Sequence, residues 1–326
     1  MDEKLTNYVN GVFAPYDGVR SVAELKADLL SDLQERFREL KAEGKDDETA
    51  FDMTIESIGD IEQTVQEVAN LSRSLERQVV INLSGSNLSQ SDFAGVIAHQ
   101  GQFKGSMLRG SDFTGADLTG SSFYGSDVRE ANFAGANLTG SSFYGSDVHE
   151  ANFAGADLTG SSFRSSDVRE ANFAGANLTD CNFSSPDLAD ANFREAILVR
   201  TNFSTAGLVG AKFIGVKLTD VTFKYTDLRK TTFENCTFLG VDFHYSDLSG
   251  QRLDGQTFLG ITFGLPALKD VSFQGATLKN VSFRPVGLWS MKRAIQSIHF
   301  DGAMMDKLTY AALKGLGADV SKVTVL

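Results

Sequence analysis

From Ile81 to Leu288 a large apolar residue recurs at every fifth position without an insertion or a deletion, with Ala98 replacing one of them. The centres of these five-residue units are the positions whose numbers end in 3 or 8, beginning with Leu83. Twenty-one of the 25 phenylalanines occupy such centres, and the four outside the array are Phe13, Phe37, Phe51 and Phe300. This register dictates a repeating architecture.

A second period, of twenty residues, lies over the first. The segment Ser111–Glu130 returns almost unchanged at Ala131–Glu150 and again at Ala151–Glu170. The residue two positions before each centre is small or β-branched, so two alternate side chains face inward, as in a very short strand. Glycine is frequent two positions after the centre, where a type II turn needs a positive φ. A short strand and a corner, repeated four times, describe a square coil.

Successive coils are expected to stack at the strand spacing of about 4.8 Å, which gives roughly ten coils. The centres alternate between phenylalanine and leucine or valine, so two opposite faces would stack phenyl rings and two would stack aliphatic side chains. The predicted structural core includes Phe113, Phe123, Phe133, Phe143, Phe153, Phe163 and Phe173.

The units resemble those of pentapeptide repeat proteins, whose pattern is Ala or Ser, Asp or Asn, Leu or Phe, and then two polar or Gly residues. The resemblance implies a mainly β fold, a right-handed quadrilateral β-helix. Three regions are predicted: a helical N-terminal domain in residues 1–78, the β-helix in residues 79–290, and a helical C-terminal cap in residues 291–326.

Apolar residues at helical spacing predict three short amphipathic helices in the N-terminal region. The first covers the run VAELKADLLSDLQERFREL and ends at Gly44, the second runs from about Asp47 to Ser57, and the third starts near Asp60. This run, with the phrase IESIGDIEQTV that follows, resembles the permease prefix or HAAS-type signalling domain of bacterial membrane proteins. Two roles remain open for the bundle: covering the exposed strand edge of the coil, or docking another protein.

The C-terminal region predicts a helix over Met304–Leu316 and one last strand within residues 319–326. The resemblance extends to pentapeptide proteins that inhibit DNA gyrase, in which the C-terminal end commonly forms a dimer contact. A homodimer through the cap is therefore a hypothesis, motivated by four residues placed on the predicted helix: Met304, Met305, Tyr310 and Leu313.

No arrangement of residues points to catalysis. The four histidines are scattered, none lies beside a cysteine at metal-ligand spacing, and neither a catalytic triad order nor a phosphate loop is present. A rigid rod without a cleft is also a poor scaffold for an enzyme. We therefore expect a non-catalytic protein with no cofactor and no metal.

The net charge and the cysteines limit the kinds of partner and the cellular compartment that we expect. A net charge of −12 disfavours direct binding of nucleic acid. No apolar run reaches transmembrane length, so membrane insertion is not expected. Cys181 and Cys236 are both inward on different faces of the coil, which favours reduced thiols and a cytoplasmic protein. The family resemblances imply a bacterial one.

Stacking makes neighbours of residues twenty apart and creates a candidate acidic interaction face. Its members are Asp127, Asp147, Asp167 and Asp187 in one column, and Glu130, Glu150, Glu170 and Asp190 one corner away. Arg129, His149 and Arg169 run between the columns, but no neutral residue alternates with the aspartates to relieve like-charge repulsion. The carboxylates either accept hydrogen bonds from corner amides or form a phosphate-like ladder.

The charge density along the coil tests whether the carboxylates could resemble the phosphates of DNA. Residues 111–190 hold 12 acids and 3 bases, a net −9. Over the expected length this is one charge per about 2 Å, against about 1.7 Å in duplex DNA. Residues 191–290 hold 8 acids and 11 bases, a net +3, so only half of the rod approaches DNA.

A second candidate surface is a docking strip at a solvent-facing corner, made of Tyr225, Tyr245, Leu265 and Pro285. The strip either binds a partner or packs against the C-terminal tail. The sequence thus predicts a non-catalytic protein-binding scaffold or regulator whose protein partner is unknown. The alternative is a DNA mimic that modulates a type II topoisomerase such as gyrase through the acidic face.

Overall fold

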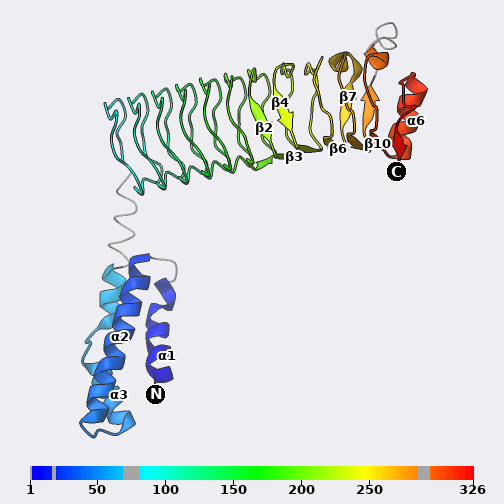
Figure 1. Cartoon of the computed structure of the whole chain (residues 1–326). Helices are drawn as coiled ribbons and strands as arrows, with labels where there is room; N and C mark the ends of the chain where they lie inside the picture. Colours follow the sequence, from blue (N-terminus) through cyan, green and yellow to red (C-terminus); the bar gives the residue numbers. More distant parts are fainter. Residues whose placement is uncertain (1, 17–19, 69–80, 285–293) are drawn as a thin grey trace. The chain divides into compact units, whose positions relative to one another are not determined.

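The computed structural model describes residues 2–16, 20–68, 81–284 and 294–326 (Figure 1). The chain divides into two compact units, Met1–Val79 and Val80–Leu326, and the second unit contains both the coil and the C-terminal segment. The predicted domain boundaries, at residues 78/79 and 290/291, lie outside the described residues.

The first unit is helical, as predicted, and its described residues contain one helix more than the sequence pattern indicated. Its elements are α1 (Asp2–Phe13), the short 3-10 helix η1 (Ala14–Tyr16), α2 (Arg20–Ala42), α3 (Asp47–Glu56) and a helical stretch at residues 61–68. The additional helix is α1, whose Leu5, Val9 and Phe13 share one face at a spacing of four and are all buried.

Local signals set the limits of α3. The Asp46 side chain accepts hydrogen bonds from the backbone N–H groups of Glu48 at 3.1 Å and Thr49 at 3.0 Å, which is N-capping. Ahead of this cap, Gly44 has a φ of 90°, a conformation that suits glycine after a helix end. None of the helices in the described residues is both long and apolar enough to cross a bilayer.

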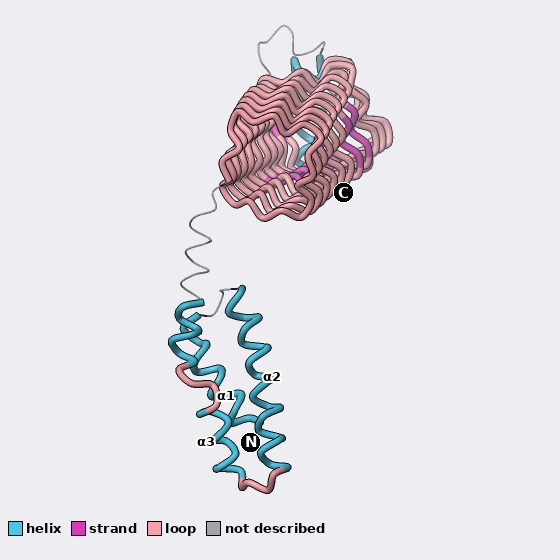
Figure 2. The backbone as a smooth tube through the Cα atoms, turned by 90° about the vertical axis from the view of Figure 1, so that its left-hand side faces the viewer, coloured by secondary structure: helices cyan, strands magenta, loops and turns pink. Residues whose placement is uncertain are grey.

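The second unit is a β-helical solenoid of stacked turns, which Figure 2 shows nested behind one another. From Asn82 to Asp227, each five-residue unit pairs in parallel with the unit twenty residues later. Asp127 pairs with Asp147, for example, and Asp147 with Asp167. The longer pairings form the strands β1 (Leu198–Val199), β2 (Lys212–Ile214), β3 (Lys217–Thr219), β4 (Thr232–Glu234), β5 (Thr237–Leu239), β6 (Thr257–Leu259), β7 (Thr262–Gly264), β8 (Thr277–Lys279) and β9 (Ser282–Arg284).

From Phe93 to Phe233, phenyl rings fill the interior on two faces, and aliphatic side chains fill the other two. The seven phenylalanines expected in the core have no exposed surface. Phe133 stacks on Phe113 at 4.8 Å between ring centroids and on Phe153 at 5.0 Å. It also meets Phe123 of the other phenyl column edge to face at 5.6 Å. Parallel stacking along the coil and edge contacts across it are both favourable geometries for aromatic pairs.

Some of the small residues two positions before the centres carry a hydroxyl group, and this group is hydrogen-bonded inside the coil. Where this residue is a serine, its hydroxyl donates to a backbone carbonyl of the preceding coil. Ser121 bonds to Ala98 at 2.8 Å and Ser141 bonds to Leu118 at 2.9 Å. A hydroxyl can therefore replace alanine at these positions without leaving an unpaired buried group.

The C-terminal segment differs from the prediction, because the coil pattern resumes after residue 293. The sequence pattern places Phe300 among the residues outside the repeat. In the structure its ring stacks on Phe273 at 5.7 Å with an angle of 4° between the rings. Thr277 pairs with Met304, a separation of 27 residues instead of twenty. The shift of seven residues hides the continuation from a search for a strict five-residue period.

The predicted C-terminal helix begins later than expected. Met304 and Met305 form strand β10 (Met304–Met305), and α6 covers only Lys307–Leu316 because Asp306 caps it. The expected last strand is present as β11 (Thr324–Val325), which pairs with β10. The placement of four dimer residues on one helix was therefore wrong. Met305 and Leu313 are buried within this unit.

Candidate functional site

The coil brings the four aspartates of the acidic interaction face together. Asp127, Asp147, Asp167 and Asp187 form consecutive parallel bridges, so they lie one above another at a corner. Each of these aspartates accepts a hydrogen bond from the backbone N–H two residues later, such as that of Ala189 on Asp187 at 3.1 Å. The carboxylates therefore have a structural role at the corners.

Arginines relieve the repulsion within the aspartate column, which corrects the expectation that this column has no such relief. Arg129 bonds to Asp127 at 2.5 Å and lies 3.4 Å from Asp147. Arg169 bonds to Asp167 at 2.5 Å and lies 3.9 Å from Asp187. Each arginine thus bridges two coils, and the column carries less net charge than its aspartates alone.

The same contacts perturb the ionisation of the face. Hydrogen bonding to the Arg129 guanidinium lowers the pKa of Asp127, and Arg169 lowers the pKa of Asp167 in the same way. The aspartates raise the pKa of both arginines, so these guanidinium groups stay charged. All four pairs are partly open to water, where an ion pair contributes little to stability.

The second acidic column, which comprises Glu130, Glu150, Glu170 and Asp190, lies beside a column of basic residues. Arg109 binds Glu130 at 2.5 Å. His149 occupies the position taken by arginine in the neighbouring coils, and its Nε2 lies 3.2 Å from Glu150 and 4.0 Å from Glu170. This column therefore contains one arginine ion pair, at Glu130, and the contacts of His149 with Glu150 and Glu170.

The His149, Glu150 and Glu170 side chains are the residues that could hold a metal ion in the part of the chain that the structure describes. One ligand atom from each lies within 4.8 Å of the others. His149 Nδ1 lies 3.1 Å from the Arg169 carbonyl oxygen, which leaves Nε2 toward the carboxylates. Sequence spacing alone did not indicate this cluster, because Glu170 comes from the next coil.

The side chains of the docking strip are described for Tyr225 and Tyr245 only. The Tyr225 and Tyr245 rings stack at 4.9 Å with an angle of 10°, and they are 62% and 73% exposed. Leu265 begins the 3-10 helix η2 (Leu265–Leu268), so the chain leaves the regular corner there. Pro285 lies outside the described residues.

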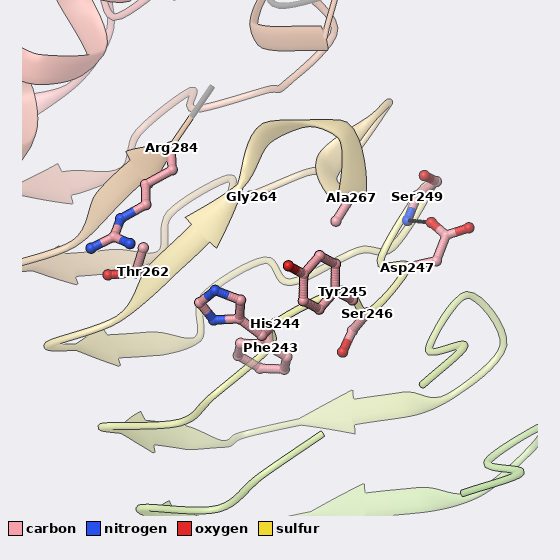
Figure 3. Close-up of a pocket in the computed structure, with 10 residues that line it drawn as sticks. All are labelled: Phe243, His244, Tyr245, Ser246, Asp247, Ser249, Thr262, Gly264, Ala267 and Arg284. Atoms are coloured by element: carbon pink, nitrogen blue, oxygen red, sulfur yellow. Dashed lines mark hydrogen bonds between the residues drawn. The ribbon is translucent and has the colours of Figure 1, made fainter. Parts of the chain in front are cut away.

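A hollow of about 500 Å³ opens beside Tyr245 (Figure 3). Its lining comes from three successive coils, because His244, Gly264 and Arg284 occupy equivalent positions twenty residues apart. The other lining residues are Phe243, Tyr245, Ser246, Asp247, Ser249, Thr262 and Ala267. The sequence placed tyrosines at this corner but gave no sign of a cavity.

A second exposed aromatic pair was missed from the sequence. Tyr124 and Tyr144 stack at 5.4 Å with an angle of 5°, and they are 52% and 37% exposed. Lys104 and Arg164 occupy the equivalent positions in the coils before and after them. The signal that could have found this pair is the separation of twenty residues between the two tyrosines.

The fold and the uniform surface columns define a β-helical solenoid protein built from five-residue units. Models of pentapeptide repeats match residues 116–193 and 186–283, described as a pentapeptide repeat region, and residues 81–110, described as pentapeptide repeats. The matches cover more than half of the chain, and the chain belongs to the pentapeptide repeat family.

Solved structures of this family are also similar to the chain. HetL, a pentapeptide repeat protein involved in heterocyst differentiation regulation from the cyanobacterium Nostoc, is 17% identical, with 72% of this chain and 95% of that one covered and a TM-score of 0.36. Full-length QnrB1, a plasmid-mediated fluoroquinolone resistance protein, is 18% identical, with coverage of 73% and 98% and a TM-score of 0.22.

A thylakoid lumen pentapeptide repeat protein of Arabidopsis thaliana is 30% identical over 42% of this chain and 72% of its own, with a TM-score of 0.13. Scores this low carry no argument about function. None of the curated proteins matches the chain.

Proposed function

We propose that this protein is a non-catalytic scaffold that binds a protein partner. One observation carries the proposal: stacked tyrosines stand exposed at corners where the fold does not need them. Tyr225 and Tyr245 have φ of 55° and 59°, a region that bulky residues rarely adopt and that glycine occupies freely. Such exposed aromatic surface is typical of interaction sites.

The proposal also covers the handedness of the coil, its C-terminal cap, the role of the N-terminal unit and the cellular compartment. The coil is right-handed, as the family resemblance implies, and α6 with β11 caps its C-terminal end. The helical N-terminal unit is a permease prefix-type domain that either covers the coil edge or docks a second protein. The protein acts in the cytoplasm of a bacterium.

The test uses the full chain as bait and compares two matched double variants. Tyr225→Ser with Tyr245→Ser removes the docking strip rings, and Tyr124→Ser with Tyr144→Ser removes the other stacked pair. We expect the first variant to lose a partner that the wild-type chain and the second variant retain. If both variants retain the same partners as the wild type, the docking strip is not the binding surface.

A DNA mimic that modulates gyrase is the second candidate. The observation in its favour is the acidic interaction face, with carboxylates repeated in every coil over Asp127–Asp190. The bridges from Arg129 and Arg169 weaken it. The test is a gyrase supercoiling assay with a quinolone present, comparing the wild type with Asp127→Lys, Asp147→Lys and Asp167→Lys combined. Mimicry requires an effect that the charge reversal abolishes, and no effect at high excess would exclude it.

A homodimer through the C-terminal segment is proposed as well, on a different surface from the one first expected. Met304 and Leu308 are 38% and 79% exposed, and Val325 in the last strand is 43% exposed. β11 ends the order of its sheet, so its outer backbone groups are open to pairing. Light scattering at high concentration should report a dimer, and a strict monomer would remove this proposal.

A further inference from the structure

The corner after Phe263 departs from the regular corners of the coil. At a regular corner, the backbone N–H two positions after a centre donates to a carbonyl of the next coil. Tyr225 bonds to His244 in this way at 3.1 Å, and Ser185 bonds to Ser204 at 3.0 Å. After Phe263 the chain instead forms the 3-10 helix η2.

The two coils that meet at this corner have separated. Thr222 pairs with Asp242, and Thr262 pairs with Ser282, but among the described residues Asp242 does not pair with Thr262. Tyr245 likewise lacks the bond to Gly264 that the regular corner pattern would give it within residues 81–284. The hollow lies in this gap, and the buried Phe243 forms part of its lining.

One wall of the hollow is an aromatic surface with a free face. Tyr225 covers one face of the Tyr245 ring at 4.9 Å. Tyr245 is 73% exposed, so its second face is not covered, and it lines the hollow together with Gly264 and Ala267 (Figure 3). A third planar ring at the same spacing would continue the stack, and this spacing is within the favourable range for aromatic pairs.

The charge available in the hollow is positive. His244 and the preceding Lys224 both contact Asp242, at 3.3 Å and 3.0 Å. The Asp247 carboxylate is engaged by Arg229 at 3.4 Å. Arg284 forms no ion pair with any other residue that the structure describes, and its guanidinium lies on the same side of the hollow as His244 (Figure 3).

Gly264 separates the two basic side chains and leaves room for an anion. His244, Gly264 and Arg284 are equivalent residues of three successive coils, so glycine occurs between two side chains that can carry positive charge. A Cβ atom placed on Gly264 would have nothing within 4 Å. An anionic group over this glycine could accept hydrogen bonds from the Arg284 guanidinium, which suits carboxylates.

We infer that the hollow binds a small planar aromatic carboxylate, with its ring stacked on Tyr245 and its carboxylate over Gly264 against Arg284. The volume of about 500 Å³ falls within the range of small-molecule sites. This inference goes beyond the proposed scaffold function, because a free small molecule is the ligand.

Isothermal titration calorimetry of the full chain with 2-naphthoate tests the inference, and 2-naphthamide is the matched neutral probe. We expect saturable binding of one naphthoate per chain and binding of the amide that is at least about tenfold weaker, the loss typical of one charge-assisted hydrogen bond. Arg284→Gln should weaken naphthoate binding by a similar factor and leave amide binding unchanged. Lys279→Gln, which removes another exposed cation nearby in the coil, should change neither.

A filling variant separates specific binding from contact elsewhere on the surface. Gly264 has φ −82° and ψ 121°, which other residues adopt, so Gly264→Leu should fold with an unchanged melting temperature. It should abolish naphthoate binding by occupying the hollow. The inference is overturned if naphthoate does not bind saturably, or if folded Gly264→Leu binds it as the wild type does. Equal binding of the acid and the amide would also overturn it.

Discussion

Replacing one core ring tests how the stacked coils are stabilised. Phe143 has no exposed surface and stacks on Phe123 and Phe163, each at 4.7 Å between centroids. It also contacts Phe133 and Phe153 edge to face, at 5.7 Å and 5.5 Å. Phe143→Ala therefore removes four ring contacts and leaves a cavity between coils.

The expected loss is at the upper end of the range for such changes. Burial and cavity formation together cost about 3–5 kcal/mol for Phe→Ala, and each aromatic pair is worth about 0.5–1.5 kcal/mol beyond its area. Backbone bonds on both sides hold the coil spacing, such as Phe143 N–H to the Ser162 carbonyl at 2.8 Å, so collapse into the cavity is restricted. We expect a loss of about 5 kcal/mol in the free energy of unfolding.

Urea denaturation followed by circular dichroism measures this loss, and Phe93→Ala is the matched control. Phe93 is only partly buried at the start of the array and stacks on one ring, Phe113, at 4.8 Å. Its replacement should cost less than half as much. Equal losses for Phe143→Ala and Phe93→Ala would refute the reasoning that two-sided stacking stabilises the central coils.

Three further results are expected. The pKa values of Asp127 and Asp167 are lowered in the folded protein, so their ionised carboxylates stabilise the fold above the usual aspartate pKa of about 3.9. This stabilisation should be lost as the pH falls through the pKa values of the folded protein. Arg129→Gln should reduce that loss, which urea titrations at acid pH measure. Burial raises the pKa of Cys236 to about 11, so a thiol reagent should modify the native protein at neutral pH far more slowly than the unfolded chain; rapid native labelling would contradict this. Asp306→Ala removes the N-cap of α6 and should lower stability by about 1 kcal/mol, with faster hydrogen exchange in that helix and at Asn280, whose N–H donates to the same carboxylate; unchanged exchange would show that the cap is dispensable.

The coil was predictable because its period is carried by the core itself. Each centre must be large and the position two residues before it must be small, so the sequence contains the packing rule in every five residues. The C-terminal continuation was not predictable in the same way. Phe300 joins the stack after a shift of seven residues, and only the backbone pairing of Thr277 with Met304 reveals the new register.

The candidate surfaces were predictable as columns but not as contacts. The period of twenty correctly places Asp127 beside Asp147, yet it does not predict the direction of the Arg129 side chain between them. In the structure Arg129 contacts both carboxylates, a contact that the sequence period alone does not predict. The hollow beside Tyr245 was likewise invisible, because it arises where one corner becomes a 3-10 helix and the backbone pairing opens.

In the regular part of the coil one turn takes twenty residues, which makes the length of the coil an adjustable quantity. Removing residues 131–150 would join Glu130 to Ala151, the same type of junction that Glu150 makes with Ala151 now. Phe123 would then stack on Phe163 with every column intact, because each coil contacts only its neighbours. Duplicating the same segment would do the reverse. Distances between sites on the surface can therefore change in steps of about 4.8 Å without redesign of the core, as in a molecular ruler.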